Sequence, residues 1–283
     1  MKSLNHFCRS LSKITAAFDA PEDLFQGLRR SEEKLPDNII IFSRRFPGEL
    51  QQTSGEPYFH QRWVMLVPLD GEAVALIERR PHRLGPGQVL VVPPFHLHTY
   101  VDIPDRIHWL VITFDWPGHT FLAQEWIGVR DLPEPARPFL SAMVDAWRAP
   151  QPNGLRAAAE LLSFLREISP SKTKMQDTIP NEELVTRVRE VVQKKSIGVS
   201  VSEVAKTLGT SESHLRAQFR KAAGIGLGRY LREARLRQAA VWLRDEGMLV
   251  KDAAEKAGYA DIFTFSRAFS RTVGRPPSAV RKN

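Results

Sequence analysis

Apolar residues in the last third of the chain recur at spacings of three and four, which is the period of an amphipathic helix. The pattern predicts a short helix from Val201 to Leu208, followed by a longer helix that ends near Gly224. The same arrangement returns from Val250 to Gly274, and in both copies a phenylalanine precedes the closing glycine by five residues. Between the copies, the stretch from Leu227 to Gly247 lacks proline and is rich in strong helix formers, so it predicts one long helix.

Each copy is a short helix, a tight turn and a longer helix, which is the pattern of a helix-turn-helix unit. The two units span residues 201–223 and 250–273. Gly209 and Gly258 stand where the turn requires a positive φ, which glycine adopts without a steric penalty. Asp261 can cap the last long helix. One such hairpin could be an ordinary part of an α-helical domain, but two with matching landmarks indicate a DNA-binding protein.

Upstream of the repeats the pattern changes to short β-rich runs separated by glycine and proline turns. Short strands at such regular spacing predict a β-barrel or a β-sandwich. The expected strands are Ile39–Phe42, Trp63–Val67, Val74–Ile77, Val89–Val92 and His108–Phe114. The predicted fold class is therefore α+β, with an N-terminal cupin-like β-barrel and flanking helices joined to a C-terminal all-α domain.

Two amphipathic helices are expected after the barrel, at residues 136–148 and 155–168, because both segments are apolar at helical spacing. A polar segment at residues 170–181 lacks any periodicity and is typical of an interdomain linker. The predicted domains are therefore residues 1–169 and residues 182–283.

The distribution of charge supports a nucleic-acid partner. The chain of 283 residues has a formal net charge of +8. Residues 182–283 hold 20 Lys and Arg against 11 Asp and Glu, a net charge of +9, so the whole positive excess lies with the repeats. A basic helical domain beside a nearly neutral one is the electrostatic footprint of phosphate binding.

Other features of the composition favour a cytoplasmic protein without a membrane partner. The chain has no run of about 18 apolar residues that could span a bilayer. Its first residues carry no continuous apolar core of the kind found in a secretory signal. Cys8 is the only cysteine, so no internal disulfide can form, which is consistent with a reducing compartment.

The chain from Glu182 to its C-terminus resembles the AraC/XylS family of transcription regulators. The strongest element is the second unit, where AGYADIFTFSRAFSRTVGRPPSAVR is close to the family signature. Gly258 with Tyr259, the run from Phe265 to Phe269, Gly274 and Pro277 stand in the order and spacing of that signature. The first unit matches it more loosely.

The resemblance implies that exposed residues on the second helix of each unit read DNA bases. Carried over by position, these residues are Ser213, His214, Arg216 and Ala217 in the first unit and Ile262, Phe263, Ser266 and Arg267 in the second. An arginine can donate two hydrogen bonds to guanine O6 and N7. Ile262 and Phe263 depart from the polar residues often found there, so they either contact thymine methyl groups or pack inward. Arg220, Lys221 and Arg271 are expected to contact phosphates.

The segment from His82 to Tyr100 resembles the second half of a small cupin-type barrel, which AraC-type regulators commonly carry as their effector-binding domain. We expect effector contacts from His60, Trp63, His96 and His98 at the barrel mouth. His96 and His98 would share a face of a strand, because they are two residues apart. The three histidines could instead be structural or bind a divalent metal. No carboxylate stands at a recognisable ligand spacing, so we expect neither a metal nor another cofactor.

These observations predict a sequence-specific, effector-responsive transcription regulator that is not an enzyme. Activation is the commoner mode in the resembled family, which also implies RNA polymerase as a partner beside promoter DNA and the small-molecule effector. The apolar stripe at residues 155–168 resembles the helix pair through which family members form homodimers, although it could equally pack on its own barrel. The alternative function is a metal-dependent cupin enzyme with a basic helical domain.

Overall fold

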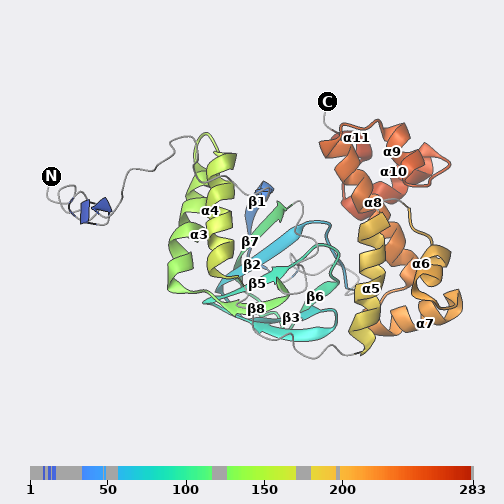
Figure 1. Ribbon diagram of the computed structural model, residues 1–283, viewed down its shortest axis with the longest axis horizontal. Coiled ribbons are helices and arrows are strands. Elements are labelled where there is room, and N and C mark those ends of the chain that lie inside the picture. Colours follow the sequence, from blue (N-terminus) through green and yellow to red (C-terminus); the bar gives the residue numbers. More distant parts are fainter. Residues whose placement is uncertain are drawn as a thin grey trace. The chain divides into compact units, whose positions relative to one another are not determined.

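The computed structural model describes residues 34–46, 48, 57–116, 126–169, 180–195 and 198–281, together with a few positions nearer the N-terminus. The chain divides into two compact units, Met1–Glu33 and Lys34–Asn283. All the elements below belong to the second unit (Figure 1). The linker expected at residues 170–181 lies outside the described residues, apart from positions 180 and 181.

The described residues between 34 and 169, here called the sheet lobe, form two antiparallel sheets. The larger sheet has the strand order β1-β7-β2-β5-β8 and the smaller one β4-β3-β6. The strands are β1 (Asp37–Arg44), β2 (Trp63–Asp70), β3 (Ala73–Ile77), β4 (Arg80–Leu84), β5 (Gln88–Val92), β6 (His98–Val101), β7 (His108–Asp115) and β8 (Gly128–Asp131). The five strands expected from the sequence are confirmed, whereas β4, β6 and β8 were not expected.

The two sheets do not close into a ring within the described residues, so the expected barrel is an open pair of sheets. Strand β2 shows how they pack, because successive side chains of a strand point to opposite faces. Val64 and Leu66 belong to the apolar cluster that also holds Ala75 of the smaller sheet. Trp63 and Met65 belong to a different cluster, shared with helices. Both faces of β2 are therefore buried, which explains why its sequence is a nearly continuous apolar run.

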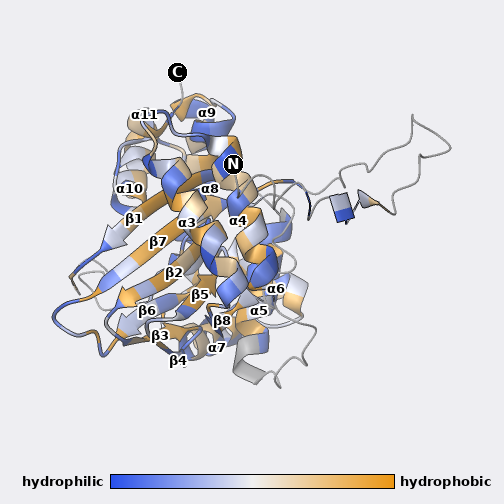
Figure 2. Ribbon diagram, turned by 90° about the vertical axis from the view of Figure 1, so that its left-hand side faces the viewer, coloured by the Kyte–Doolittle hydropathy of each residue, from blue (hydrophilic) through white to orange (hydrophobic). Residues whose placement is uncertain are grey.

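Two helices, α3 (Arg137–Arg148) and α4 (Gly154–Glu167), follow the short 3-10 helix η3 (Glu134–Ala136) and cover one face of the larger sheet (Figure 1). Leu161, Phe164 and Leu165 of α4 are buried in the same cluster as Trp63. Figure 2 shows mixed hydrophobic and hydrophilic colouring on these helices, as expected for elements with one buried face.

The position of α4 corrects one expectation. The apolar stripe of residues 155–168 packs against its own sheet, so its buried leucines are not available to a second chain. Leu155 is the exception, with 73% of its surface exposed. The packing alternative that the sequence left open is therefore the correct one for this stripe.

The described residues from 180 to 281, here called the helical lobe, contain the two expected helix-turn-helix units. The helices are α5 (Pro180–Lys195), α6 (Val201–Leu208), α7 (Glu212–Ala223), α8 (Leu227–Asp245), α9 (Val250–Lys256), α10 (Ile262–Val273) and α11 (Pro277–Val280). Gly209 and Gly258 adopt φ values of 67° and 75° in the two turns. The Asp261 side chain caps α10 by accepting hydrogen bonds from the Phe263 and Thr264 amides. In the described part of the chain, no helix combines the length and apolarity needed to cross a membrane.

Helix α8 joins the two units and packs against each with a different half (Figure 1). Its N-terminal half, including Tyr230 and Ala234, is buried with α5, α6 and α7. Its C-terminal half, including Leu236 and Leu243, is buried with α9 and α10. The cluster around Tyr230 also contains Phe59 and Leu97 of the sheet lobe. The core of the first unit is therefore continuous with the sheet lobe.

Candidate nucleic-acid interface and effector site

Helices α7 and α10 each bury one stripe and leave the opposite face to solvent. Leu215 and Phe219 hold α7 in the lobe, and Phe265 and Phe269 hold α10, with all four side chains buried. The residues predicted to meet DNA from α7 are all exposed, namely Ser213, His214, Arg216, Ala217, Arg220 and Lys221. Those predicted from α10 are exposed at Ile262, Phe263, Arg267 and Arg271 and half-buried at Ser266. Both faces predicted to bind DNA are therefore exposed to solvent.

The structure separates the two alternatives for the apolar residues at the start of α10. Phe263 exposes 75% of its surface and Ile262 exposes 37%, so Phe263 is not a packing residue. The neighbouring Asp261 is engaged by Thr264, whose hydrogen bonds lower the pKa of the Asp261 carboxyl. A capped helix start with an exposed phenyl ring suits apolar contact with thymine methyl groups in the major groove.

Arg216 forms an ion pair with Glu212 one turn earlier on α7, with 3.6 Å between Nη2 and Oε2. Both side chains are about half exposed, and such surface pairs contribute little to stability. The guanidinium can therefore leave Glu212 at small cost when a base edge is offered.

The predicted effector residues His96 and His98 are both fully buried, beside the junction of the two lobes. His98 begins β6, whereas His96 precedes the strand, so they do not share a strand face as expected. The Nδ1 of His98 lies 2.9 Å from the His96 carbonyl oxygen, and the Nδ1 of His96 lies 3.0 Å from that of Pro94. These carbonyls can only accept, so each Nδ1 carries the proton and each Nε2 keeps a lone pair.

Burial decides the charge of these histidines. It lowers the pKa of His98 to about 4 and drives the pKa of His96 and His60 well below the usual value. The rings are therefore neutral at pH 7. The Nε2 atoms of His96 and His98 are buried and have no hydrogen-bond partner among the described residues. Unsatisfied buried acceptors are costly, so these two atoms are candidates for contact with a ligand.

His60 forms an aromatic group with Tyr58 and His98. These three residues and His96 are here called the histidine cluster. The ring centroids of His60 and His98 are 5.4 Å apart, and those of Tyr58 and His98 are 4.5 Å apart. No group of three or more potential metal ligands comes together in the described part of the chain. The available Nε2 atoms here are acceptors on uncharged rings, which suits a small organic molecule with hydrogen-bond donors.

Trp63 does not join this group. Its ring stacks near Phe114 and contacts Trp116 and Trp126, in the cluster between the larger sheet and α4. The histidines lie with the rings of Tyr58 and Tyr100 instead. The described contacts therefore do not bring Trp63 to the histidines, because Trp63 faces the opposite side of β2 from Val64, which packs in the cluster with Tyr58 and Tyr100.

Sequence reasoning missed Arg237, which α8 contributes to the histidine cluster. Its guanidinium lies over the Phe59 ring, 5.2 Å from the centroid, and its charge helps to lower the pKa of His60 and His98. Its Nε is buried and has no hydrogen-bond partner among the described residues. From the sequence, Arg237 is expected only on a basic flank of the long helix, together with Arg229, Arg232 and Arg235. Tyr230, Arg237 and Arg244 all contact the sheet lobe and stand seven residues apart on α8. This spacing places them on one face of the helix, and it is the signal in the sequence that could have indicated the contact.

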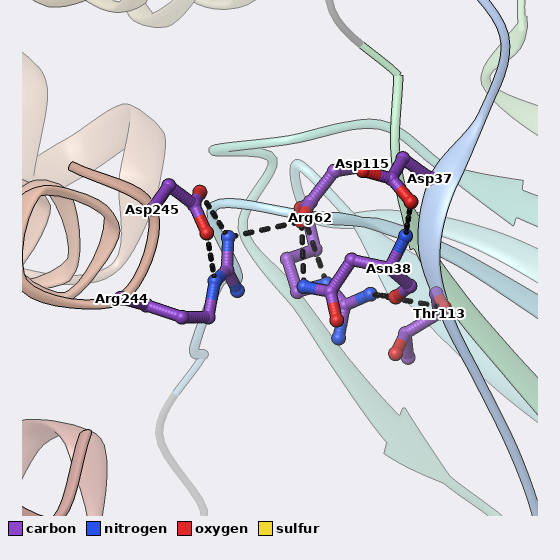
Figure 3. Close-up of polar contacts among 7 residues, drawn as sticks. All are labelled: Asp37, Asn38, Arg62, Thr113, Asp115, Arg244 and Asp245. Carbon is purple, nitrogen blue, oxygen red and sulfur yellow. Dashed lines mark hydrogen bonds and ion pairs between the residues drawn. The ribbon is translucent and has the colours of Figure 1, made fainter. Parts of the chain in front are cut away.

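Figure 3 shows the contact of Arg244 with the sheet lobe. An Nη2 of Arg244 lies 3.0 Å from Asp115 Oδ2, and the Arg62 Nε lies 3.2 Å from Asp115 Oδ1. Asn38 donates to the same carboxylate at 2.7 Å, and Arg62 also donates to the Asn38 carbonyl. The Asp115 carboxylate at the end of β7 thus connects the sheet lobe to the C-terminal end of α8.

A second, more deeply buried ion pair joins the lobes at α5. Arg189 Nη1 lies 3.0 Å from Glu78 Oε1, and both side chains are nearly inaccessible to solvent. Burial raises the pKa of Glu78, and the nearby Arg189 charge opposes part of that rise. Glu78 lies in the β3–β4 turn, so this pair fixes the turn against α5.

Comparison with known proteins matches each lobe to a known family of domains. Residues 45–188 match the AraC-like ligand binding domain, and residues 204–283 match a helix-turn-helix domain. The first match alone covers half of the chain. The chain belongs to the AraC family. It is therefore a ligand-responsive, DNA-binding transcription regulator, with the ligand-binding domain in the sheet lobe and the DNA-binding domain in the helical lobe.

Three proteins illustrate how similar individual proteins are to the chain, and each is identical to it at a quarter or less of the aligned residues. The transcriptional activator RhaR of Klebsiella pneumoniae is 23% identical over 89% of this chain and 96% of its own length. The Msm operon regulatory protein of Streptococcus mutans is 25% identical over 44% of this chain, and the match spans 45% of that protein. ToxT of Vibrio cholerae is a solved structure with 13% identity and a TM-score of 0.45, covering 86% of this chain and 95% of its own.

Proposed function

We propose that α7 and α10 bind two successive major-groove segments of promoter DNA and read their bases. The reading residues are Ser213, His214, Arg216, Ala217, Ile262, Phe263, Ser266 and Arg267, while Arg220, Lys221 and Arg271 contact phosphates. The observation that carries this proposal is the exposure of both faces in one lobe, with every anchoring phenylalanine buried behind them. Helix-turn-helix dimers read two half-sites about one helical turn apart, and two units in one chain would do the same.

Helix α8 supports a fixed separation between the two reading helices. Its two halves are buried in two different apolar clusters, one for each unit. Moving one unit relative to the other would therefore expose buried side chains such as Tyr230 or Leu243. We expect the bound sequence to have two conserved segments at one constant spacing.

The effector is proposed to bind at the histidine cluster, with Arg237 reaching it from α8. Two buried Nε2 acceptors and one buried arginine Nε lack partners among the described residues. A small polar molecule with hydrogen-bond donors for the imidazoles and an acceptor for Arg237 would satisfy all three. Because Arg237 belongs to the helix that joins the DNA-binding units, such a ligand would favour one arrangement of α8 over others.

The remaining parts of the proposal concern partners and location. The name of RhaR describes an activator, and the same role, acting with RNA polymerase in the cytoplasm, is proposed for this chain. A homodimer is also proposed, through an outer surface of α3 and α4 that includes Trp147 and Leu155, since the stripe between 155 and 168 is occupied. No catalytic activity is proposed.

Selection from random double-stranded DNA by the full-length protein tests the central part of this proposal. The expected result is a bipartite motif, in which Arg216→Ala relaxes one segment and Arg267→Ala relaxes the other. A motif with only one conserved segment would show that one unit does not read bases. Equal losses on all sequences would make the two arginines phosphate contacts.

A screen of small polar metabolites by thermal unfolding tests the effector site. A true effector is expected to raise the melting temperature of the full chain and to lose this effect in His98→Gln and in Arg237→Met. A ligand whose stabilisation survives both substitutions binds elsewhere, and the histidine cluster would then be structural.

A further inference from the structure

A pocket of about 170 Å³ lies beside α8, at the point where that helix meets α5 and the sheet lobe. Its apolar walls come from Val192, Val199, Leu231, Ala234, Trp242 and, from the sheet lobe, Phe95. A dry cavity of similar size lined by apolar side chains accepts one benzene ring. The pocket therefore has room for a single six-membered ring.

Two polar residues of the pocket wall carry donors that the protein does not use. Gln193 Nε2 and Arg235 Nε are buried and have no hydrogen-bond partner among the described residues. Arg235 donates instead through Nη1 to the Ala257 carbonyl at 3.3 Å, which anchors its guanidinium at the wall. Two unsatisfied buried donors call for an acceptor, and leaving them without one is costly.

The charge of the wall selects the kind of acceptor. Arg235 is the only charged residue that lines the pocket, and the lining contains neither Asp nor Glu within the described ranges. An anionic group beside a guanidinium and an amide gains charge-assisted hydrogen bonds, whereas a cationic group would be repelled. A carboxylate on a small ring matches the volume, the apolar walls and the donors together.

We propose that this pocket binds a small apolar carboxylate of single-ring size, at a site distinct from the histidine cluster. The ring lies among Leu231, Ala234 and Phe95, and the carboxylate accepts hydrogen bonds from Gln193 and Arg235. The site belongs mainly to the helical lobe, so it adds a second ligand input to a protein whose family model assigns ligand binding to the sheet lobe.

Phe95 connects this pocket to the histidine cluster. It adopts a φ of 65°, a left-handed backbone that residues other than glycine rarely take. Its amide donates to the His60 carbonyl at 2.7 Å, and its own carbonyl accepts from the Tyr230 hydroxyl at 3.3 Å. A ring held against Phe95 would therefore stabilise these contacts between the two lobes. Ligands at the pocket and at the histidine cluster would then influence each other's affinity.

Calorimetric titration of the full-length protein with benzoate tests the proposal. The expected dissociation constant is about 1 mM, because a ligand with so few non-hydrogen atoms can gain only a limited binding free energy. Benzylamine has a similar size and the opposite charge, and it is expected not to bind. Binding of both compounds with equal strength would contradict the charge argument, and no binding of benzoate would overturn the proposal.

Three variants locate the site. Gln193→Leu keeps the approximate shape and removes one donor, so benzoate should bind about tenfold more weakly while the free protein keeps or gains stability. Ala234→Leu fills part of the pocket and should abolish binding. Gln218→Leu on α7 is the matched control and should leave benzoate binding unchanged.

Two results would show that the site is wrongly placed. Benzoate binding that persists in both pocket variants would overturn the proposal, and binding that is lost in His98→Gln but kept in Gln193→Leu would assign the ligand to the histidine cluster. DNA binding is measured on the same preparations. A protein that binds DNA but not benzoate would overturn this inference and leave the proposed DNA-binding function standing.

Discussion

The two helix-turn-helix units share one pattern but are held in the molecule in different ways. The first unit is buried in a cluster that also contains Phe59 and Leu97 of the sheet lobe. The second unit packs on the C-terminal half of α8 in a cluster made of helical-lobe residues. Its neighbouring contact with the sheet lobe is polar, through Arg244 and Asp115, whose side chains are about one quarter exposed.

This difference indicates how a signal from the ligand-binding domain reaches DNA. Apolar burial, together with a buried ion pair on the neighbouring α5, couples the first unit firmly to the sheet lobe. The second unit is coupled weakly, through a partly solvated ion pair at the end of α8. We infer that the first unit moves with the sheet lobe and that the second follows through α8. Substitutions at the two junctions test this inference.

The largest effect is expected from Arg189→Met, which leaves Glu78 buried without its partner. Loss of one member of a buried ion pair costs about 3–5 kcal/mol. The pKa of Glu78 is already raised by burial and should rise further, so the folded state binds the proton more tightly than the unfolded state. Stability of the variant should therefore recover as the pH falls through the raised pKa, in contrast to ordinary acid denaturation.

Denaturant unfolding between pH 4 and pH 8 measures this effect. The double variant Glu78→Gln with Arg189→Met is the control, and it should regain most of the lost stability because no charge remains buried. A single variant as stable as the unsubstituted protein at pH 7 would mean that the first unit is not tied to the sheet lobe by this pair.

The next effect concerns the histidine cluster at the same junction. His98 has a pKa of about 4 because it is buried, with Tyr58, His60 and the charge of Arg237 beside it. The unfolded state binds a proton near pH 6.5 and the folded state does not. The contribution of neutral His98 to the free energy of unfolding is therefore complete above about pH 6.5. It falls by roughly 3 kcal/mol as the pH decreases to about 4.

His98→Gln should flatten the acid side of the stability curve by about that amount, as measured by thermal unfolding over the same pH range. His108 lies outside the cluster, at the start of β7, so His108→Gln serves as the matched substitution and should leave the curve unchanged. Equal curves for all three proteins would mean that His98 is solvated in solution.

A smaller effect is expected at the DNA surface of the second unit. Arg267 is exposed on α10, and its replacement by alanine should cost about 1–3 kcal/mol on the selected sequence and relax preference at one base pair. Competition binding at fixed salt measures this loss. Arg275 lies beyond the helix and is exposed, so Arg275→Ala should show no change in sequence preference.

The smallest effect is expected from Arg244→Met, which removes the polar link beside the second unit. An ion pair with this exposure contributes at most about 1 kcal/mol, and salt should reduce that contribution. The unfolding midpoint should therefore shift much less than in Arg189→Met. A shift as large as that of Arg189→Met would contradict the distinction between the two units.

The helical lobe was largely predictable from the sequence because its elements depend on local signals. The turns need glycine at Gly209 and Gly258, and the cap of α10 needs Asp261 directly before the first helical residue. The apolar period then fixes which faces of α7 and α10 are buried, so the exposed residues that are proposed to bind DNA follow without knowledge of distant contacts.

The missed strands have a physical explanation. Strand β4 is polar and contains Pro81, and it lies at the edge of the smaller sheet, where a missing amide donor is tolerated. The β3–β4 turn uses Glu78 and Arg79 at positive φ instead of the usual Asn-Gly. Neither feature resembles the pattern of a buried strand, so sequence periodicity gave no indication of this hairpin.

The candidate effector site was only partly predictable because it is assembled from distant segments. The histidines could be found as a chemical group, but the face occupied by Trp63 depends on which strands pair with β2. The arrival of Arg237 depends on how α8 packs against Phe59. Apart from the seven-residue spacing along α8, the local sequence pattern does not indicate such contacts between the lobes.

The central claim is that α8 holds two reading helices at one separation on the same side of a duplex. Methylation interference on the selected DNA, with the full-length protein, tests it directly by reporting guanine N7 contacts in the major groove. The account predicts two clusters of interference about 10 base pairs apart, with the cluster nearer the second unit lost in Arg267→Ala. One cluster alone, or two clusters on opposite faces of the duplex, would contradict it.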